Sequence, residues 1–372
     1  MSTGGTAELD HAARAVSTAP SRSSELANWV RYRSAPSIAR AKERATGEGS
    51  SARPGHVESH FLKANSPDGR RAIWLKHTLL VPRDPARPAV AELWAIAFAD
   101  GGLRKLAQKR SFPIAEAHFG KEPFRITVPG AELRTGLAAG SVGDGEHQVR
   151  WQLRFEASEE AFLPFRYARM YSGPLPRSKS LTPVPDARMH GYVHAFGERW
   201  QLDGWRGAQG HNWGQSHAQE YAWVHANAWS EERNGQALEG AWLEALTGRM
   251  RVGRVTTPWL SVAGAALDGE RYRFDGLSAL LSRRLSIAPN RYQLTVEQAG
   301  VRLTLSLAAD AAQFAGLHYE DPDGSSLTCL NSKLARGTLE LTTRRWSRRF
   351  YTEQGALELG TREPQRGVAV LV

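Results

Sequence analysis

The sequence predicts an all-β protein whose antiparallel strands close into barrels or stack into sandwiches. Three observations carry this prediction. Apolar residues recur with a period of two, convincing helical windows are scarce after residue 56, and many breaks between strands hold glycine, proline or aspartate. Because a chain with so many strands has to pair or cover its sheet edges, closed or stacked sheets are expected.

Single segments show the alternation clearly. In segment 149–156, valine, tryptophan, leucine and phenylalanine alternate with arginine, glutamine and glutamate, which is typical of a half-buried strand. Segments 292–297 and 301–307 alternate in the same way around Ala299-Gly300, and together they predict a hairpin. Further strands are expected at 74–81, 91–98, 132–142, 189–196, 238–245 and 337–343.

The chain of 372 residues is long enough for about two domains. Residues 1–55 are expected to form a short, partly helical or disordered N-terminal extension that is largely flexible, because small and polar residues dominate its beginning. We assign 56–245 to the first domain and 246–372 to the second. A connection near Thr256–Pro258 is an alternative boundary.

The net charge of +10 is a weak signal of function. Only eight of the 48 basic residues are lysine, and the arginines are spread along the chain, so no nucleic-acid partner is expected. The densest group surrounds Trp346. We interpret it as a solvated strand end in preference to a contact with a polyanion or anionic lipid. Its members are Arg344, Arg345, Arg348 and Arg349.

The single cysteine, Cys329, excludes an intramolecular disulfide and any multi-cysteine metal site. Its strand-like context favours a small buried residue over a nucleophile. No apolar run reaches the length of a membrane span and no signal-peptide core is seen, so a cytoplasmic location is the default expectation. Peripheral contact with a membrane surface stays open.

Two segments place large amphipathic rings on one strand face and small residues on the other. The first face carries His190, Tyr192, His194 and Phe196, and the second carries Tyr221, Trp223, His225, Asn227 and Trp229. Such rows suit the lining of a cavity for an apolar ligand with a few polar handles. A solvent-exposed aromatic face, or a core whose polar groups satisfy one another, is the alternative.

Other chemistries find little support. The histidines at 190, 194, 211, 217 and 225 lack a compact ligand spacing, so no metal is expected. The Gly-x-Ser-x-Gly turn of hydrolases and phosphate-binding glycine loops before helices are both absent, which leaves no cofactor implied.

Several segments together resemble the tocopherol cyclase family. Gly210-His-Asn-Trp-Gly214 followed by Tyr221-Ala-Trp-Val-His-Ala-Asn227 resembles its Asn-Trp-Gly turn and the Trp-rich strand after it. His190-Gly191 and segments 327–332, 337–341 and 355–360 resemble other strands of that family. The wider group of similar proteins includes carotenoid hydratases and fungal Diels–Alderases. The resemblance covers about 185–362. It implies two consecutive lipocalin-like barrels with a ligand pocket within one barrel or between the two.

The chain departs from the cyclase pattern at several positions. Tyr221 stands where the family has tryptophan, His225 replaces a glutamine, and Ser216-His217 occupies the place of Phe-Pro. These differences change the polar groups of the implied pocket, so cyclisation of a prenylquinol is not carried over.

The resulting functional hypothesis is a cofactor-independent enzyme acting on a hydrophobic isoprenoid or polyketide-like small molecule, by intramolecular cyclisation or hydration. The candidate proton-transfer residues are His225, Glu220, His194 and Glu244. The candidate ligand contacts are Tyr192, His190, Tyr221, Trp223, Asn227 and Trp229, while His211, Asn212, Trp213 and Gly214 are expected to form a structural turn. The alternatives are a non-enzymatic carrier of a hydrophobic ligand and an interaction protein whose aromatic faces are plain core. No obligate protein partner is predicted.

Overall fold

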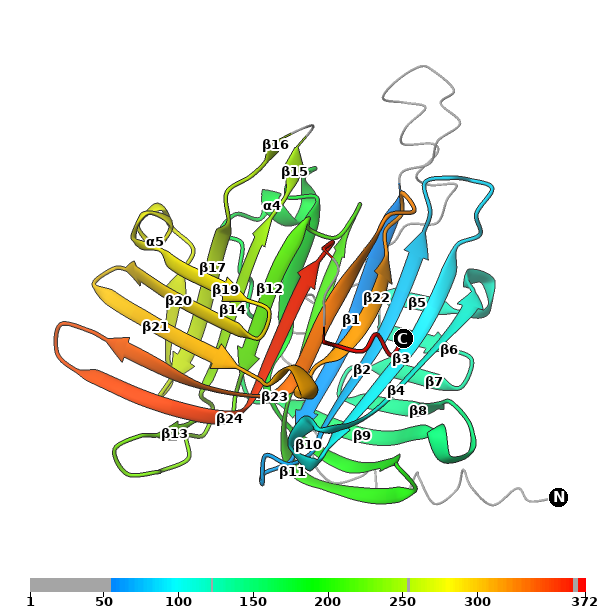
Figure 1. The fold of residues 1–372 in the computed structure, drawn as a ribbon, viewed down its shortest axis with the longest axis horizontal. Helices are drawn as coiled ribbons and strands as arrows, with labels where there is room; N and C mark the ends of the chain where they lie inside the picture. The colour runs from blue at the N-terminus through cyan, green and yellow to red at the C-terminus, as the bar shows by residue number, and fades with distance from the viewer. Residues whose placement is uncertain (1–54, 122, 253–254, 364–366) are drawn as a thin grey trace.

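Antiparallel strands dominate the structure and form two strongly curled sheets that lie side by side (Figure 1). The computed structural model describes residues 55–372 except 122, 253–254 and 364–366. The predicted N-terminal extension, 1–55, therefore lies outside the described residues apart from Gly55. Within the described residues the all-β prediction is confirmed.

The first sheet has the strand order β4-β3-β2-β1-β11-β10-β9-β8-β7-β6-β5. Its strands are β1 (His56–Asn65), β2 (Ala72–Val81), β3 (Val90–Ala99), β4 (Arg104–Pro113), β5 (His118–Lys121), β6 (Phe124–Val128), β7 (Ala131–Arg134), β8 (Leu137–Val142), β9 (Val149–Ala157), β10 (Ser178–Ala195) and β11 (Glu198–Gly214).

The second sheet has the order β18-β17-β14-β12-β24-β23-β21-β20-β19, with β13 and β22 paired to β24 and β23. Its strands are β12 (Glu220–Ala226), β13 (Ser230–Glu231), β14 (Trp242–Arg249), β17 (Leu260–Leu267), β18 (Glu270–Phe274), β19 (Arg284–Ala288), β20 (Arg291–Gln298), β21 (Val301–Ala308), β22 (Ala315–Glu320), β23 (Ser326–Thr342) and β24 (Ser347–Thr361).

The remaining elements are short. They are β15 (Arg251–Val252) paired with β16 (Val255–Thr256), the helices α4 (Arg169–Ser172) and α5 (Leu277–Ser282), and the 3₁₀ turns η2 (Asp100–Gly102), η3 (Ile114–Glu116), η4 (Gly145–His147) and η5 (Ala311–Gln313).

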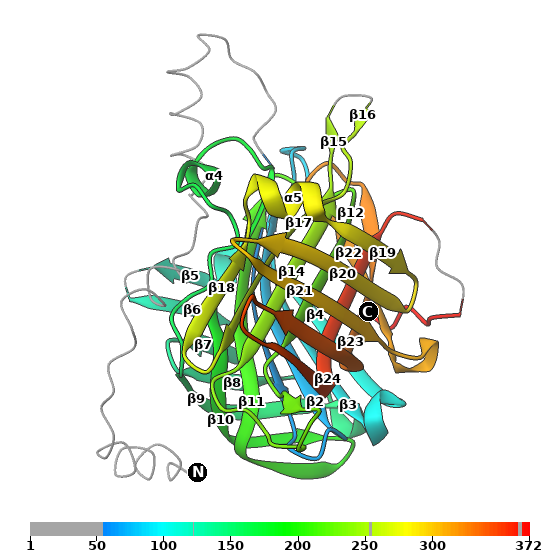
Figure 2. The ribbon, with the colours of Figure 1, turned by 90° about the vertical axis from the view of Figure 1, so that its left-hand side faces the viewer.

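Each sheet curls around an apolar core of its own. The first core includes Trp151, Leu153 and Trp200, and strands β3 and β4 reach across it to contact β8. The second core includes Leu303 and Leu305. Both curled sheets are visible in the side view, where β19, β20 and β21 cross over β14 and β17 (Figure 2). The architecture is that of two consecutive barrel-like domains.

Most predicted strands occur where the period of two placed them. Strand β9 buries its apolar residues and exposes Arg150 and Arg154. The hairpin between β20 and β21 turns at Ala299 and Gly300, whose φ angles of 53° and 77° fit a tight two-residue turn. The strand predicted at 132–142 is in fact two, β7 and β8, because Gly136 turns the chain with a φ of 72°.

The sheets divide the chain between Gly214 and Glu220, whereas the sequence suggested a division at 245/246. Strand β12 pairs with β14 and β24, so the strands of 220–245, which the sequence assigned to the end of the first domain, belong to the second sheet. The predicted domain 56–245 placed segments 190–196 and 221–229 in the same domain, whereas they lie in different sheets. Alternation indicates only that a segment is a strand and does not identify the strands that pair with it.

Strands β1 and β12 are buried on both faces because they lie where the two sheets meet. A third apolar cluster fills this junction and includes Phe61, Trp74, Trp223 and Leu317. The rings of Phe61 and Trp223 meet edge to face at 5.3 Å between centroids. Gly210 of β11 makes room for Phe61, since a Cβ there would lie 2.1 Å from the ring.

Replacing Phe61 by alanine should therefore loosen the junction. We expect Phe61→Ala to lower the free energy of unfolding by about 3–5 kcal/mol, because a buried aromatic ring is lost and a cavity is left. Urea unfolding followed by circular dichroism would measure the change. Leu103→Ala, at a side chain that is 62% exposed, is the control and should change it by less than about 0.5 kcal/mol. Equal effects of the two variants would show that Phe61 contributes no more to the free energy of unfolding than an exposed leucine does.

Candidate functional site

The junction between the sheets contains a layer of buried polar side chains. On β12, Ala222, Val224 and Ala226 face the core of the second barrel, and the alternate residues Trp223, His225 and Asn227 face the first sheet. In strand β1, Leu62 and Ala64 enter the core of the first barrel, and the alternate residues face the second sheet. The period of two thus sends one face of each strand into the junction.

His225 and Glu244 are directly opposite each other on β12 and β14, and both are fully buried. His225 Nε2 donates a hydrogen bond to the backbone carbonyl of Pro185 at 2.8 Å, while its Nδ1 has no hydrogen-bond partner. Glu244 Oε2 accepts a hydrogen bond from the Thr182 hydroxyl, while Oε1 has no partner. Each residue therefore has one buried polar atom without a hydrogen-bond partner, and the Trp223 side chain lies near the Glu244 carboxyl.

Burial sets the protonation of both groups. It raises the pKa of Glu244 to about 7, so this carboxyl keeps its proton well above the range of an exposed glutamate. Burial also lowers the pKa of His225 well below its usual range, with a further contribution from the charges of Lys63 and Lys333. A neutral carboxylic acid and a neutral imidazole in adjacent positions can act as a proton donor and a proton acceptor.

Two buried lysines lie on either side of His225. Lys63 Nζ donates to Asn65 Oδ1 and to Asn227 Oδ1, both at 3.1 Å, and burial lowers its pKa to about 7. Lys333 Nζ is 2.7 Å from a carboxylate oxygen of Glu358 and 5.7 Å from the centre of the Trp223 ring. Lys333 is thus paired with a carboxylate, and Lys63, with a pKa of about 7, carries a partial positive charge near neutral pH. That charge would stabilise negative charge that develops beside it.

A third lysine extends this layer on the β2 side. Lys76 Nζ lies 3.8 Å from the centre of the Tyr319 ring, and burial lowers its pKa to about 8. Cys329 is buried in β23, as its sequence context predicted, and burial raises the pKa of its thiol to about 12. The thiol is therefore protonated and unsuited to act as a nucleophile.

Four of the residues predicted from the sequence come together at the junction: Trp223, His225, Asn227 and Glu244. The Trp223 and His225 rings stack, with centroids 5.7 Å apart. Asn227 is fully engaged, because its Nδ2 donates to Asp186 at 2.9 Å and to the carbonyl of Gly207 at 2.7 Å. We interpret Asn227 as a residue that positions β12 against the first sheet.

Other predicted residues lie elsewhere. The alternate residues Val193 and Ala195 of β10 enter the first core, so His190, Tyr192 and His194 project from the outer surface of that barrel. There His190 pairs with Asp203 at 3.4 Å, and the Arg199 guanidinium lies 4.4 Å from the Tyr192 ring. The assignment of these three side chains to the ligand site therefore needs correction.

The second strand also sends some predicted residues away. Glu220 forms an ion pair with Arg249 at the start of β12. Tyr221 packs over Gly360 toward the same end of the strand, where a Cβ would lie 2.0 Å from its ring. Trp229 lies beyond the end of β12 in the core of the second barrel, and its indole donates to the carbonyl of Ala226 at 3.0 Å. None of the three is brought beside His225 and Glu244.

The segment predicted as a structural turn is instead the end of strand β11. His211, Asn212, Trp213 and Gly214 pair with β1 on one side and β10 on the other. Gly214 is required by close packing rather than by a turn, since a Cβ there would lie 2.1 Å from the carbonyl oxygen of Arg177. An Asn-Trp-Gly sequence suits a turn, but pairing with strands on both sides holds this segment in an extended conformation.

Sequence reasoning missed a second polar group, inside the first barrel. Ligand atoms of Glu58, His60 and His211 lie within 4.8 Å of one another, and all three side chains are buried. Burial lowers the pKa of His60 to about 3 and that of His77 to about 4. The alternation of His56, Glu58 and His60 was a usable signal, because it places three polar groups in succession on one face of the strand.

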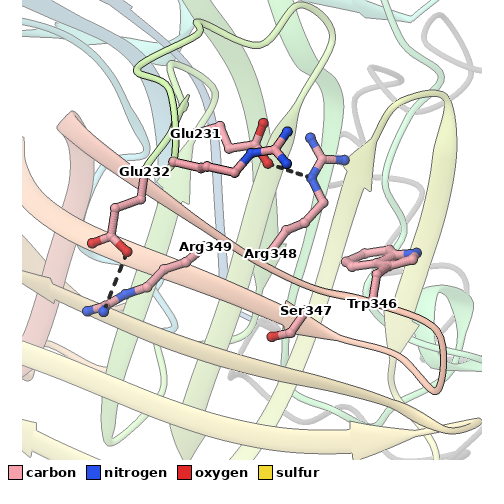
Figure 3. Close-up of a pocket in the computed structure, with 7 residues that line it drawn as sticks. Glu231, Glu232, Trp346, Ser347, Arg348 and Arg349 are labelled. Carbon is pink, nitrogen blue, oxygen red and sulfur yellow. Dashed lines mark hydrogen bonds and ion pairs between the residues drawn. The ribbon is translucent and has the colours of Figure 1, made fainter.

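A pocket of about 630 Å³ opens at the far end of the second barrel (Figure 3). Arg348 pairs there with Glu231 at 3.0 Å, and Arg349 with Glu232 at 3.6 Å. Arg233, Trp346 and Ser347 complete the wall. The two arginines from the predicted basic cluster are therefore matched by carboxylates, which weakens their attraction for an anion.

No helix among the described residues is both long and apolar enough to cross a membrane.

Fold and junction together define a lipocalin-like protein of two consecutive barrels with a layer of buried polar side chains between them. No protein-family model matches the chain. An uncharacterized protein of Mycobacterium tuberculosis is 26% identical over 296 residues, which covers 79% of this chain and 83% of the relative.

Solved structures share this architecture at low sequence identity. CghA matches with a TM-score of 0.51 and 13% identity, covering 84% of this chain and 90% of CghA. A Nitrosomonas europaea protein assigned as an AttH gives 0.50 and 13%, covering 82% and 92%. Kievitone hydratase from Nectria haematococca gives 0.49 and 12%, covering 83% and 89%. The likeness to CghA and the AttH protein establishes the common fold.

The raised pKa of Glu244 predicts a particular pH dependence of stability. Its folded pKa of about 7 exceeds its ordinary value of 4.5, so its stabilising contribution is complete below pH 4.5 and is lost as the pH rises through 7. Between about pH 4.5 and 7.5 the wild type should lose about 3 kcal/mol of unfolding free energy relative to Glu244→Gln. Urea unfolding at several pH values measures this difference.

The control for this experiment is Glu156→Gln, at an exposed position of β9. This variant should follow the pH profile of the wild type. A Glu244→Gln profile that runs parallel to the wild type across the same interval would mean that Glu244 is already ionised in the folded protein.

Proposed function

We propose that this protein is a cofactor-independent enzyme that adds water to, or cyclises, a hydrophobic small molecule at the junction between its barrels. The observation that carries the proposal is the His225–Glu244 pair: two facing, fully buried groups, each with one polar atom left without a hydrogen-bond partner. Buried unsatisfied groups are costly, and those retained in a site commonly serve the ligand.

Hydration of a conjugated double bond illustrates the chemistry that this pair supports. His225 Nδ1 would take a proton from water as the water oxygen attacks one carbon of the double bond. The Glu244 carboxylic acid would give its proton to the adjacent carbon, so that one water molecule is added in total. Return of the proton from His225 to Glu244 restores the starting state.

The charges around the pair favour one substrate class over the other. A carbocation, as formed when an isolated isoprenoid double bond is protonated, would lie among Lys63 and Lys333 and would be destabilised by them. A carbonyl-conjugated, polyketide-like substrate develops negative charge on oxygen, which the same ammonium groups stabilise. We therefore favour the polyketide-like substrate over the isoprenoid.

Access to the pair requires movement, because both side chains are fully buried. The segment that covers them is the irregular part of β10. Its pairing with β11 shifts register between Leu181 and Val184 and again between Val184 and Ala187. Thr182 and Pro185, which contact Glu244 and His225, lie in this segment. A stretch with an interrupted ladder is the least costly part of the sheet to displace.

The test begins with the ligand that the recombinant protein carries, extracted with organic solvent and identified by mass spectrometry. Conjugated aryl ketones in H₂¹⁸O are the probes for hydration, which would appear as incorporation of the heavy oxygen. His225→Ala and Glu244→Gln should each lower kcat by at least about 100-fold and change the Kd of the ligand only a few-fold.

The matched controls are His147→Ala and Glu156→Gln, both on the exposed surface of the first barrel. Both should turn over like the wild type. If the two site variants instead lose ligand affinity in proportion to activity, a carrier of hydrophobic molecules is the better description. Unchanged activity in His225→Ala and Glu244→Gln would show that the active site does not lie at this junction.

A further inference from the structure

Three histidines form a row across the inside of the first barrel. His60 of β1 is the register partner of His77 on β2 and of His211 on β11, so the three side chains occupy the same level of three adjacent strands. All three are buried, at 0%, 1% and 0% exposure. Alternate residues of β1, Leu62 and Ala64, lie in the first core, which places this row on the inner face.

Glu58 completes the group from the same face of β1. Its Oε1 lies 2.8 Å from His211 Nε2 and 3.5 Å from His60 Nε2. Two ligands bound at 2.0–2.1 Å to a tetrahedral ion are about 3.3 Å apart, so the two measured distances bracket the spacing that such an ion requires. One carboxylate and two imidazoles are also a donor set that zinc commonly takes.

The hydrogen bonding inside the barrel is incomplete. Neither ring nitrogen of His60 has a hydrogen-bond partner, and the same is true of His77. His60 Nε2 has only the Glu58 carboxylate at 3.5 Å, and the other three buried imidazole nitrogens have no partner, which is a large unsatisfied polar surface for an apolar core. Phe124, 5.1 Å from the His60 ring, and Trp213, 4.6 Å from the His211 ring, enclose the group on its other sides.

We propose that Glu58, His60 and His211 bind a divalent transition-metal ion, with zinc as the best match to the donor set. The His60 and His211 rings stack at 3.9 Å, so they would turn to bring both nitrogens toward the ion. Three protein ligands leave one tetrahedral position open for water, next to the unpartnered imidazole of His77. The site lies on the opposite face of β1 from Lys63 and is therefore separate from the His225–Glu244 junction.

The experiment uses the full chain, stripped of metal with a chelator and then titrated with Co²⁺ and Zn²⁺. We expect one equivalent of Co²⁺ to bind and produce the visible absorption of a tetrahedral site, and Zn²⁺ to displace it. His60→Ala and Glu58→Gln should raise the Kd by at least about 100-fold, because each removes a direct ligand. Zn²⁺ should raise the unfolding temperature of the wild type and not of these variants.

His147→Ala, at an exposed histidine, is the matched control and should bind as the wild type does. Circular dichroism verifies that each variant is folded, and Glu58→Gln preserves the size of the side chain if His60→Ala does not fold. A wild-type protein that binds neither ion stoichiometrically would overturn the proposal. Equal affinity in Glu58→Gln and the wild type would do the same.

Discussion

The burial of β1 and β12 on both faces is the constraint on which the rest of this structure depends. A strand covered on both sides has no solvent to satisfy its polar side chains, so each needs a partner within the protein. Lys63 meets Asn227 across the junction, and Asn65 Nδ2 donates to the backbone carbonyl of Lys333 at 2.6 Å. These two contacts tie the sheets together at a fixed register and so determine where His225 lies relative to β10.

The charged groups of the junction are poor candidates for a purely stabilising role. Burial of an ion pair such as Lys333–Glu358 costs desolvation free energy that its attraction barely repays, and an apolar pair of similar volume is often as stable. The apolar cluster around Phe61 and Trp74 already joins the two barrels. Buried polar groups that cost desolvation free energy beside an apolar cluster are better explained by an interaction with a ligand.

Local pattern was sufficient to predict much of this fold and part of the site. The alternation in 221–227 correctly separated the face with Trp223, His225 and Asn227 from the face that enters a barrel core. The same alternation in 190–196 led to a wrong prediction, because its row of rings lies on the outer surface of the first barrel. Both segments are strands with rings on one face, but β12 is covered on that face by the first sheet, whereas β10 there faces solvent. Coverage depends on the packing of whole sheets, which no window of sequence contains.

The inner histidines were missed for a related reason. His60, His77 and His211 are widely separated in the sequence, and no local pattern links the three. Only the registers of β1 with β2 and with β11 bring them to one level. Lys63 and Lys333 are equally inconspicuous, because a single lysine in a strand ordinarily indicates a solvent-facing position. The structure shows both to be buried.

The position of β1 also has a consequence for how the chain is made. It is the first strand of the described residues, yet the groups that satisfy Glu58, Lys63 and Asn65 lie 153, 164 and 268 positions further along. During synthesis this strand leaves the ribosome long before any of those partners exists. Strand β2 follows at once and pairs with one edge of β1, but the other edge waits for β11. Contacts this distant close slowly, and an open strand edge is prone to aggregate in the interval. The first strand of the described residues therefore stays incomplete for much of synthesis, and protection of its open edge by a chaperone would matter most during that interval.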